Sequence, residues 1–274
     1  MFKKIRGFMA LSLALICFMP AISVHAEEAY VAPEQAVVTD PAATVPATAE
    51  YVSPEQVLYN QAAADVVAKQ TTRQIVFIGD SRTVGMKSAI GNDGNVWSAK
   101  VGMGYSWMKS TGVPQVEANI NANTDVVILM GVNDVRSLSY TKKYVSYLND
   151  KAAAWTALGA NVYYVSVNPM AFETSSYPGI TNSLIESWNS RMKQGLSANI
   201  AYIDTYSKVV GQVSSSDGIH YSKSSYKTIY SLINQGIIED KTTKEYAALL
   251  SAATVQAVPA TPEVPATVDA PVAY

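Results

Sequence analysis

The stretch Arg73-Gln-Ile-Val-Phe-Ile-Gly-Asp-Ser81 decides the fold of this chain. Its four consecutive apolar residues, three of them β-branched, are typical of a short buried strand. The glycine that ends the run is followed by Asp80 and Ser81, where residues 81–90 show a helical pattern that Gly91 closes. A strand that leads through a tight turn into a helix begins the alternation that builds a parallel sheet.

The rest of the central region repeats this alternation. The run Asp125-Val-Val-Ile-Leu-Met130 has the continuous apolar character of a strand that is covered on both faces. We expect further strands at 95–100, 161–167 and 200–203, and helices at 140–158, 180–198, 222–235 and 242–252. The pattern predicts a three-layer α/β/α sandwich with a central, mostly parallel five-stranded sheet.

The first 26 residues have the pattern of a cleaved secretory signal peptide. Lys3, Lys4 and Arg6 form a positive region, and the apolar segment 8–19 is too short to span a bilayer comfortably. Small residues in Val24-His-Ala26 stand where a signal peptidase would cut. We therefore expect a secreted, extracellular protein without stable membrane insertion after cleavage; a retained N-terminal anchor is the alternative.

Two flanking segments, 27–54 and 252–274, differ in composition from the middle. They hold eight of the twelve prolines and no Lys or Arg. Such segments do not bury enough apolar surface to fold alone, so we expect a disordered spacer and tail around one domain at 55–251. Their Pro-Ala-Thr units could associate with a cell wall or carry sugars; a plain linker is the alternative.

Composition also excludes several classes of function. Charged residues make up 15% of the chain, the net charge is -2, and there is no basic run, so we expect no nucleic-acid partner. Signal cleavage would remove the only cysteine, Cys17, and one of the two histidines, His25. The mature chain would then have no thiol chemistry and no multi-histidine metal site, and we expect neither a metal nor a cofactor. Any histidine chemistry must use His220.

Four short motifs stand after predicted strands. They are Gly79-Asp-Ser81, Val101-Gly-Met-Gly-Tyr-Ser106, Gly131-Val-Asn-Asp134 and Asp217-Gly-Ile-His220. Taken singly, each has an ordinary explanation: a capping serine, a turn, a loop asparagine or a structural Asp-His pair. Taken together, they would converge on one crevice, because the carboxyl ends of parallel strands meet at the same edge of the sheet.

This ordered set resembles the Ser-Gly-Asn-His blocks of the SGNH (GDSL-like) hydrolases, and the resemblance covers the central domain. The serine lacks the G-x-S-x-G elbow of the α/β-hydrolases, which favours the SGNH family. The resemblance implies a flavodoxin-like sandwich and an esterase that needs no cofactor. It also implies a triad in which Ser81 is the nucleophile, His220 the base and Asp217 the residue that orients the base.

The resemblance further implies an oxyanion hole. Its donors would be the backbone N–H groups of Ser81 and Gly104 and the side chain of Asn133. Gly102 competes with Gly104 for the glycine role, and the Gly-Tyr-Ser order favours Gly104. We expect Asp80 and Asp134 to tie their loops together.

The substrate is less well defined by the sequence. Three aromatic residues neighbour the motifs and could stack on sugars: Tyr105, Trp107 and Tyr221. The alternative is that these rings simply pack the loops. We expect short-chain or O-acetyl esters on extracellular or cell-wall carbohydrate as substrates. An O-acyltransferase with the same residues and a non-catalytic wall-binding module are the competing functions, and the complete motif set favours the esterase.

Overall fold

The computed structural model describes residues 52–256 of the chain. Its strands are β1 (Gln74–Gly79), β2 (Val96–Ala99), β3 (Thr124–Leu129), β4 (Asn161–Val165) and β5 (Ile200–Ile203). Its α-helices are α1 (Pro54–Gln70), α2 (Ser81–Ile90), α3 (Tyr105–Trp107), α4 (Tyr140–Ala157), α5 (Asn182–Gly195), α6 (Tyr206–Val209) and α7 (Lys223–Gln256). Two short turns of helix, η1 (Met108–Gly112) and η2 (Glu117–Asn119), lie between α3 and β3.

All five strands are parallel and lie in the order β2-β1-β3-β4-β5. This confirms the predicted five-stranded sheet. The strand order reverses between β1 and β3, and in such sheets the crevice for a ligand opens beyond the carboxyl ends of the strands at that point. Gly79 pairs with both Ala99 and Leu129, so the residues that follow these three strands emerge side by side.

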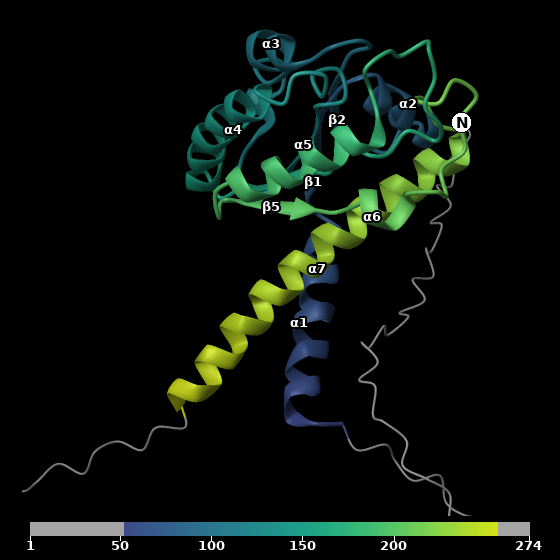
Figure 1. The fold of residues 1–274 in the computed structure, drawn as a ribbon. Helices are drawn as coiled ribbons and strands as arrows, with labels where there is room; N and C mark the ends of the chain where they lie inside the picture. Colours follow the sequence, from purple (N-terminus) through teal and green to yellow (C-terminus); the bar gives the residue numbers. More distant parts are fainter. Residues whose placement is uncertain (1–51, 257–274) are drawn as a thin grey trace, which may run out of the picture. The chain divides into compact units, whose positions relative to one another are not determined.

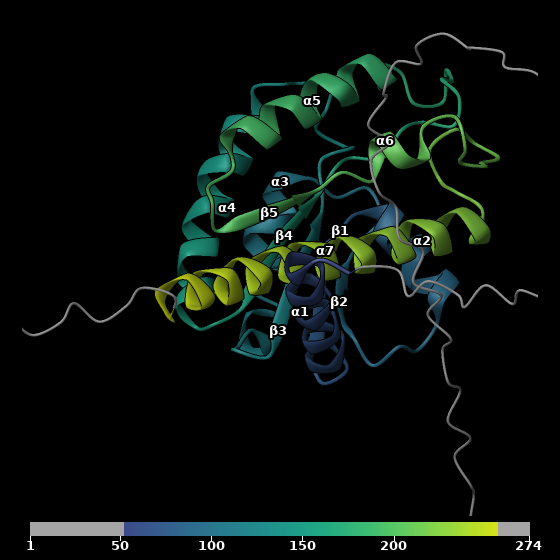
Figure 2. The ribbon, with the colours of Figure 1, turned by 90° about the horizontal axis from the view of Figure 1, so that it is seen from below.

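Alternate side chains of the strands point to opposite faces and build two separate cores. Val76 and Ile78 of β1 pack with residues of α4 and α5, whereas Ile75 and Phe77 pack with residues of α2 and α7. Figures 1 and 2 show these helices covering the two faces of the sheet. The three-layer sandwich is therefore confirmed.

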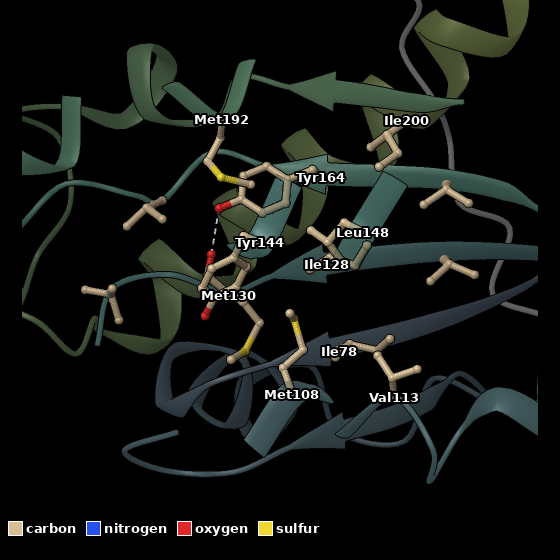
Figure 3. Close-up of a cluster of buried hydrophobic side chains, with 14 of the residues drawn as sticks. Ile78, Met108, Val113, Ile128, Met130, Tyr144, Leu148, Tyr164, Met192 and Ile200 are labelled. Atoms are coloured by element: carbon tan, nitrogen blue, oxygen red, sulfur yellow. Dashed lines mark hydrogen bonds between the residues drawn. The ribbon is translucent and has the colours of Figure 1, made fainter. Parts of the chain in front are cut away.

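Figure 3 shows part of the first core, where side chains from the sheet, α4 and α5 interlock. Ile78, Tyr164 and Leu148 are all fully buried in it. Within this core, the Tyr164 hydroxyl donates a 2.7 Å hydrogen bond to the carbonyl of Met130. The loop that begins at Met130 carries Asn133, so this bond fixes its start.

The closing part of the domain differs from the prediction of two helices, 222–235 and 242–252. It is one helix, α7, which runs without a break from Lys223 to Gln256. Gly236 lies inside this helix and does not end it. A Cβ there would lie 2.7 Å from Ile203 Cγ2, so the glycine lets α7 pack closely on β5. Within residues 52–256, no helix is both long and apolar enough to cross a bilayer.

A buried charge network fastens α1 and α7 to the amino edge of the sheet. Asp125, at the start of β3, is fully buried and accepts hydrogen bonds from Lys241 Nζ (2.6 Å), Arg73 Nε (3.0 Å), Asn161 Nδ2 (2.9 Å) and Gln70 Nε2 (2.8 Å). Complete pairing of this kind is what a buried carboxylate requires. The second half of α7 crosses and packs against α1, a helix that the sequence did not predict (Figure 1).

Candidate active site

The turn from β1 into α2 places Ser81 at the carboxyl edge of the sheet. Asp80 caps α2 by accepting a 3.0 Å hydrogen bond from the Arg82 backbone N–H, and Ser81 is the first residue of the helix. A Cβ at Gly79 would lie only 1.8 Å from Thr83 Oγ1, so the tight turn needs glycine there. The Ser81 hydroxyl therefore stands at a helix N-terminus.

Ser81 meets the only histidine of the described residues. His220 Nε2 lies 2.9 Å from Ser81 Oγ, and His220 Nδ1 lies 2.7 Å from Asp217 Oδ2. With its proton on Nδ1, the imidazole donates to the carboxylate and can accept the serine proton. The structure thus brings together the three predicted triad residues. In the sequence, Ser81 lies 139 positions before His220, and Asp217 lies 3 positions before it.

Asp217 also shapes the turn that carries His220. Its Oδ1 accepts the backbone N–H groups of Ile219 (3.0 Å) and His220 (2.8 Å). Gly218, between them, has φ +89°, a conformation that favours glycine. Burial alone raises the pKa of Asp217, but the hydrogen bonds from the side chain and backbone of His220 outweigh it and hold this pKa well below its ordinary value. Asp217 is therefore ionised at neutral pH.

Hydrogen bonds join the loop after β2 to the loop after β3, beside the β1–α2 turn that carries Ser81. Asn133 Nδ2 donates a 2.8 Å hydrogen bond to the Met103 carbonyl, which uses one of its two N–H groups. A Cβ at Gly104 would lie 2.4 Å from Asp134 Oδ2, so the two loops approach closely at this glycine. Gly102 has φ +73° and open space around it. Both glycines are therefore needed, Gly104 for close approach and Gly102 for its backbone conformation.

A buried arginine, which the sequence analysis missed, connects the serine turn with the histidine loop. Arg82 Nε donates to the Ile219 carbonyl (3.1 Å) and Nη1 to the Asn168 carbonyl (2.5 Å). Burial raises the pKa of the neighbouring Asp80 to about 6, although the Arg82 guanidinium acts in the opposite direction. Only the position of Arg82 directly after Ser81 could have drawn attention to it.

The three predicted aromatic residues have different surroundings. Tyr221 is 7% exposed, its hydroxyl donates to the Pro169 carbonyl, and the Arg82 guanidinium covers its ring at 5.1 Å. This favours the alternative that Tyr221 packs the loop. Tyr105 and Trp107 are half-buried against the first core, and the Tyr105 ring meets Tyr144 edge-on at 5.3 Å. Both keep some surface exposed.

The surroundings of His220 are polar. A pocket of about 270 Å³ beside it is lined by Ser214, Ser215, Ser216, Tyr221 and Ser222. The described residues contain no group of three or more His, Cys, Asp or Glu side chains arranged to hold a metal ion. The residues brought together here can act as a nucleophile, a base and donors to an anion.

Comparison with known proteins supports the fold. No family model matches the sequence, and no curated protein matches it. A proposed acylhydrolase from Bacteroides fragilis is similar in structure, with a TM-score of 0.51, 20% identity, and coverage of 70% of this chain and 100% of that chain. A GDSL-like lipase from Bacteroides thetaiotaomicron has a TM-score of 0.48 and 22% identity, and covers 66% of this chain and 97% of its own.

A third similar structure is Axe2, an acetylxylan esterase from Geobacillus stearothermophilus, with a TM-score of 0.45, 16% identity, and coverage of 60% of this chain and 94% of that chain. The chain shares the α/β sandwich fold of the Bacteroides fragilis protein, as the alternation of its strands and helices predicts. At these identities the similarity concerns the fold alone.

Proposed function

We propose that this protein is a secreted serine esterase that hydrolyses acyl esters through a covalent acyl-enzyme. The observation that carries the proposal is the continuous contact from Ser81 Oγ to His220 Nε2 and from His220 Nδ1 to Asp217. A nucleophile, a base and a carboxylate that orients the base are the parts that acyl transfer by serine requires. A pure binding module has no need for this arrangement.

In the first half of the reaction, His220 Nε2 takes the proton of Ser81 while Oγ attacks the carbonyl carbon of the ester. The tetrahedral intermediate then collapses: the bond to the alcohol oxygen breaks, and His220 returns the proton to the leaving alcohol. Asp217 stabilises the imidazolium that forms between these steps. Water, activated by His220, attacks the acyl-enzyme and releases the acid.

The negative charge of the intermediate would be held by three donors. They are the backbone N–H of Ser81 at the start of α2, the backbone N–H of Gly104, and the second N–H of Asn133 Nδ2. Each such donor typically lowers the barrier by about 3 kcal/mol. The hydrogen bonds that link Asn133 to Met103 and Asp134 to Tyr105 support this role, because they hold both loops in place before substrate arrives.

The preferred substrates would be acetyl or short-chain esters of carbohydrate. The polar, serine-lined pocket beside His220 supports a hydroxyl-rich alcohol portion, since sugar hydroxyls bond readily to serine side chains. The half-buried rings of Tyr105 and Trp107 offer apolar surface at the loop after β2. Secretion and cell-wall association depend on segments 1–26, 27–54 and 252–274, which lie outside the described residues apart from 52–54 and 252–256.

The test is hydrolysis of p-nitrophenyl acetate, butyrate and octanoate by the wild type and by Ser81→Ala. Ser88→Ala, an exposed serine on the same helix, is the matched control. We expect activity only with Ser81 present, highest with acetate, and fluorophosphonate labelling that Ser81→Ala abolishes. Turnover and labelling that persist in Ser81→Ala, or that are absent from the wild type, would contradict the esterase.

A further inference from the structure

A tyrosine from a different loop reaches the triad. Tyr177 lies between β4 and α5, and its hydroxyl is 3.1 Å from Asp217 Oδ2 and 3.4 Å from His220 Nδ1. Its ring meets the imidazole edge-on, with centroids 6.0 Å apart and an interplanar angle of 73°. The hydroxyl therefore touches the hydrogen bond between His220 and Asp217, at the ring nitrogen that does not face Ser81.

The loop that carries Tyr177 is fastened on both sides of it. After the tyrosine, Arg136 Nε donates a 2.6 Å hydrogen bond to the Pro178 carbonyl. Before it, the Ala171 N–H donates a 2.9 Å hydrogen bond to the Gly218 carbonyl, inside the Asp217–His220 turn. A Cβ at Gly218 would lie 2.4 Å from the Phe172 carbonyl oxygen, so the two loops pack directly on each other. Tyr177 thus lies in a segment that hydrogen bonds hold in place on both sides of it.

The hydrogen bonds of Asp217 leave a defined place for the tyrosine. Oδ1 accepts two backbone N–H groups and the Ser215 hydroxyl (3.2 Å), whereas the donors to Oδ2 among residues 52–256 are His220 and Tyr177. An ionised carboxylate has no proton to give, so the Tyr177 hydroxyl must be the donor. Burial, followed by the bond to Asp217, raises the pKa of the Tyr177 phenol, which keeps it a donor at neutral pH.

We propose that Tyr177 is a positioning residue of the triad: its O–H holds Oδ2 of Asp217 toward His220 Nδ1 and takes up part of the carboxylate charge. The inference rests on the proposed function and adds to it a residue from the loop between β4 and α5. Two other charged groups lie near the imidazole. Asp80 faces it from the β1–α2 turn, and the Arg82 guanidinium lies behind the adjacent Ile219 carbonyl.

The test compares Tyr177→Phe with Tyr230→Phe. Tyr230 also donates its hydroxyl to a carboxylate, Asp93 Oδ2 at 3.0 Å, but Asp93 precedes β2 at the opposite edge of the sheet. Loss of one hydrogen bond to a charged group should lower kcat for p-nitrophenyl acetate about tenfold in Tyr177→Phe and leave KM unchanged. Tyr230→Phe should keep the wild-type kcat.

A second measurement, the NMR titration of His220, does not require that the protein turn over a substrate. The full chain with His25→Gln has His220 as its only histidine, so NMR follows the titration of that ring alone. Without the tyrosine donor, more of the Asp217 charge stabilises the imidazolium, and the midpoint should move up by about half a pH unit. The acid limb of the kcat/KM profile should move with it.

Two outcomes would decide against the role of Tyr177: a Tyr177→Phe titration that matches Tyr230→Phe, or a kcat equal to the wild type. A different result separates the two proposals. If the midpoint moves up while no variant hydrolyses any ester, the contact of Tyr177 with the His220–Asp217 pair is supported and only the esterase function is contradicted.

Discussion

The backbone N–H of Tyr105 donates a 2.7 Å hydrogen bond to Oδ2 of Asp134. The same oxygen accepts the hydroxyl of the buried Tyr144 at 2.8 Å. Asp134 thereby joins the loop after β2 to the loop after β3 and to α4, and it keeps Gly104 and Asn133 in a fixed relationship. This is the loop-tying role that the sequence predicted for Asp134.

Asp134→Ala should therefore lower both activity and stability. It would leave the Tyr105 N–H and the Tyr144 hydroxyl without their acceptor, and each unpaired buried group costs about 1–3 kcal/mol. We expect the free energy of unfolding in urea to fall by about that amount or more, and kcat by at least about tenfold. Tyr144→Phe is the control: it keeps the Tyr105 bond and should keep most of kcat. An equal loss of kcat in both variants would contradict this explanation.

Asn133→Ala should lower kcat by about 100-fold or more, with little change in KM. The second N–H of Asn133 Nδ2 would stabilise charge that exists only in the transition state, so ground-state binding should not depend on it. Initial rates with p-nitrophenyl acetate provide the measurement, and a thermal unfolding curve checks that loss of the Met103 hydrogen bond has not unfolded the loop. An unchanged kcat would remove Asn133 from the oxyanion hole.

Alanine substitutions should distinguish the two glycines of the loop after β2. In Gly104→Ala the new Cβ would meet Asp134 Oδ2 at 2.4 Å, so the carboxylate must move and kcat should fall at least about tenfold. In Gly102→Ala there is space for the Cβ, but φ +73° costs about 1 kcal/mol of stability, with kcat retained. Parallel rate and urea-unfolding measurements test both; the reverse ranking in kcat would assign the functional role to Gly102.

Asp80 should make the protein less stable as the pH rises from about 4 to about 6. Burial raises the pKa of Asp80 from 3.8 to about 6, so in this window the folded state binds a proton that the unfolded state has released. The free energy of unfolding should fall across the window, by about 3 kcal/mol at most, and remain at the lower value above it. Asp217 does not contribute there, because its lowered pKa makes its effect appear below about pH 4.

Asp80→Asn should remove this slope. The amide oxygen can still accept from the Arg82 N–H, so the cap of α2 remains while the titrating group is lost. Urea unfolding of the wild type and the variant at several values between pH 4 and pH 7 provides the measurement. A slope of the same size in Asp80→Asn would show that another group is responsible.

Much of this architecture could be predicted, because it depends on local patterns. Apolar runs define the strands, and the meeting of Ser81 with His220 follows from their places after parallel strands. The continuity of α7 could not be predicted, since Gly236 resembles a helix end until Ile203 is seen packed against it. Tyr177 gave no signal either, because it lies in an irregular loop and its role comes only from a contact 40 positions away.

The pairing of α1 with the end of α7 determines where the rest of the chain joins the domain. Lys69 forms an ion pair with Glu245, and Tyr59 meets Tyr246, so Pro54 and the end of α7 lie beyond the amino edge of the sheet (Figure 1). Ser81 lies at the carboxyl edge. The Ser81–His220–Asp217 cluster and the two ends of the described chain are thus on opposite sides of the sheet, so whatever joins the domain at either end leaves the opening above Ser81 unobstructed by the junction itself.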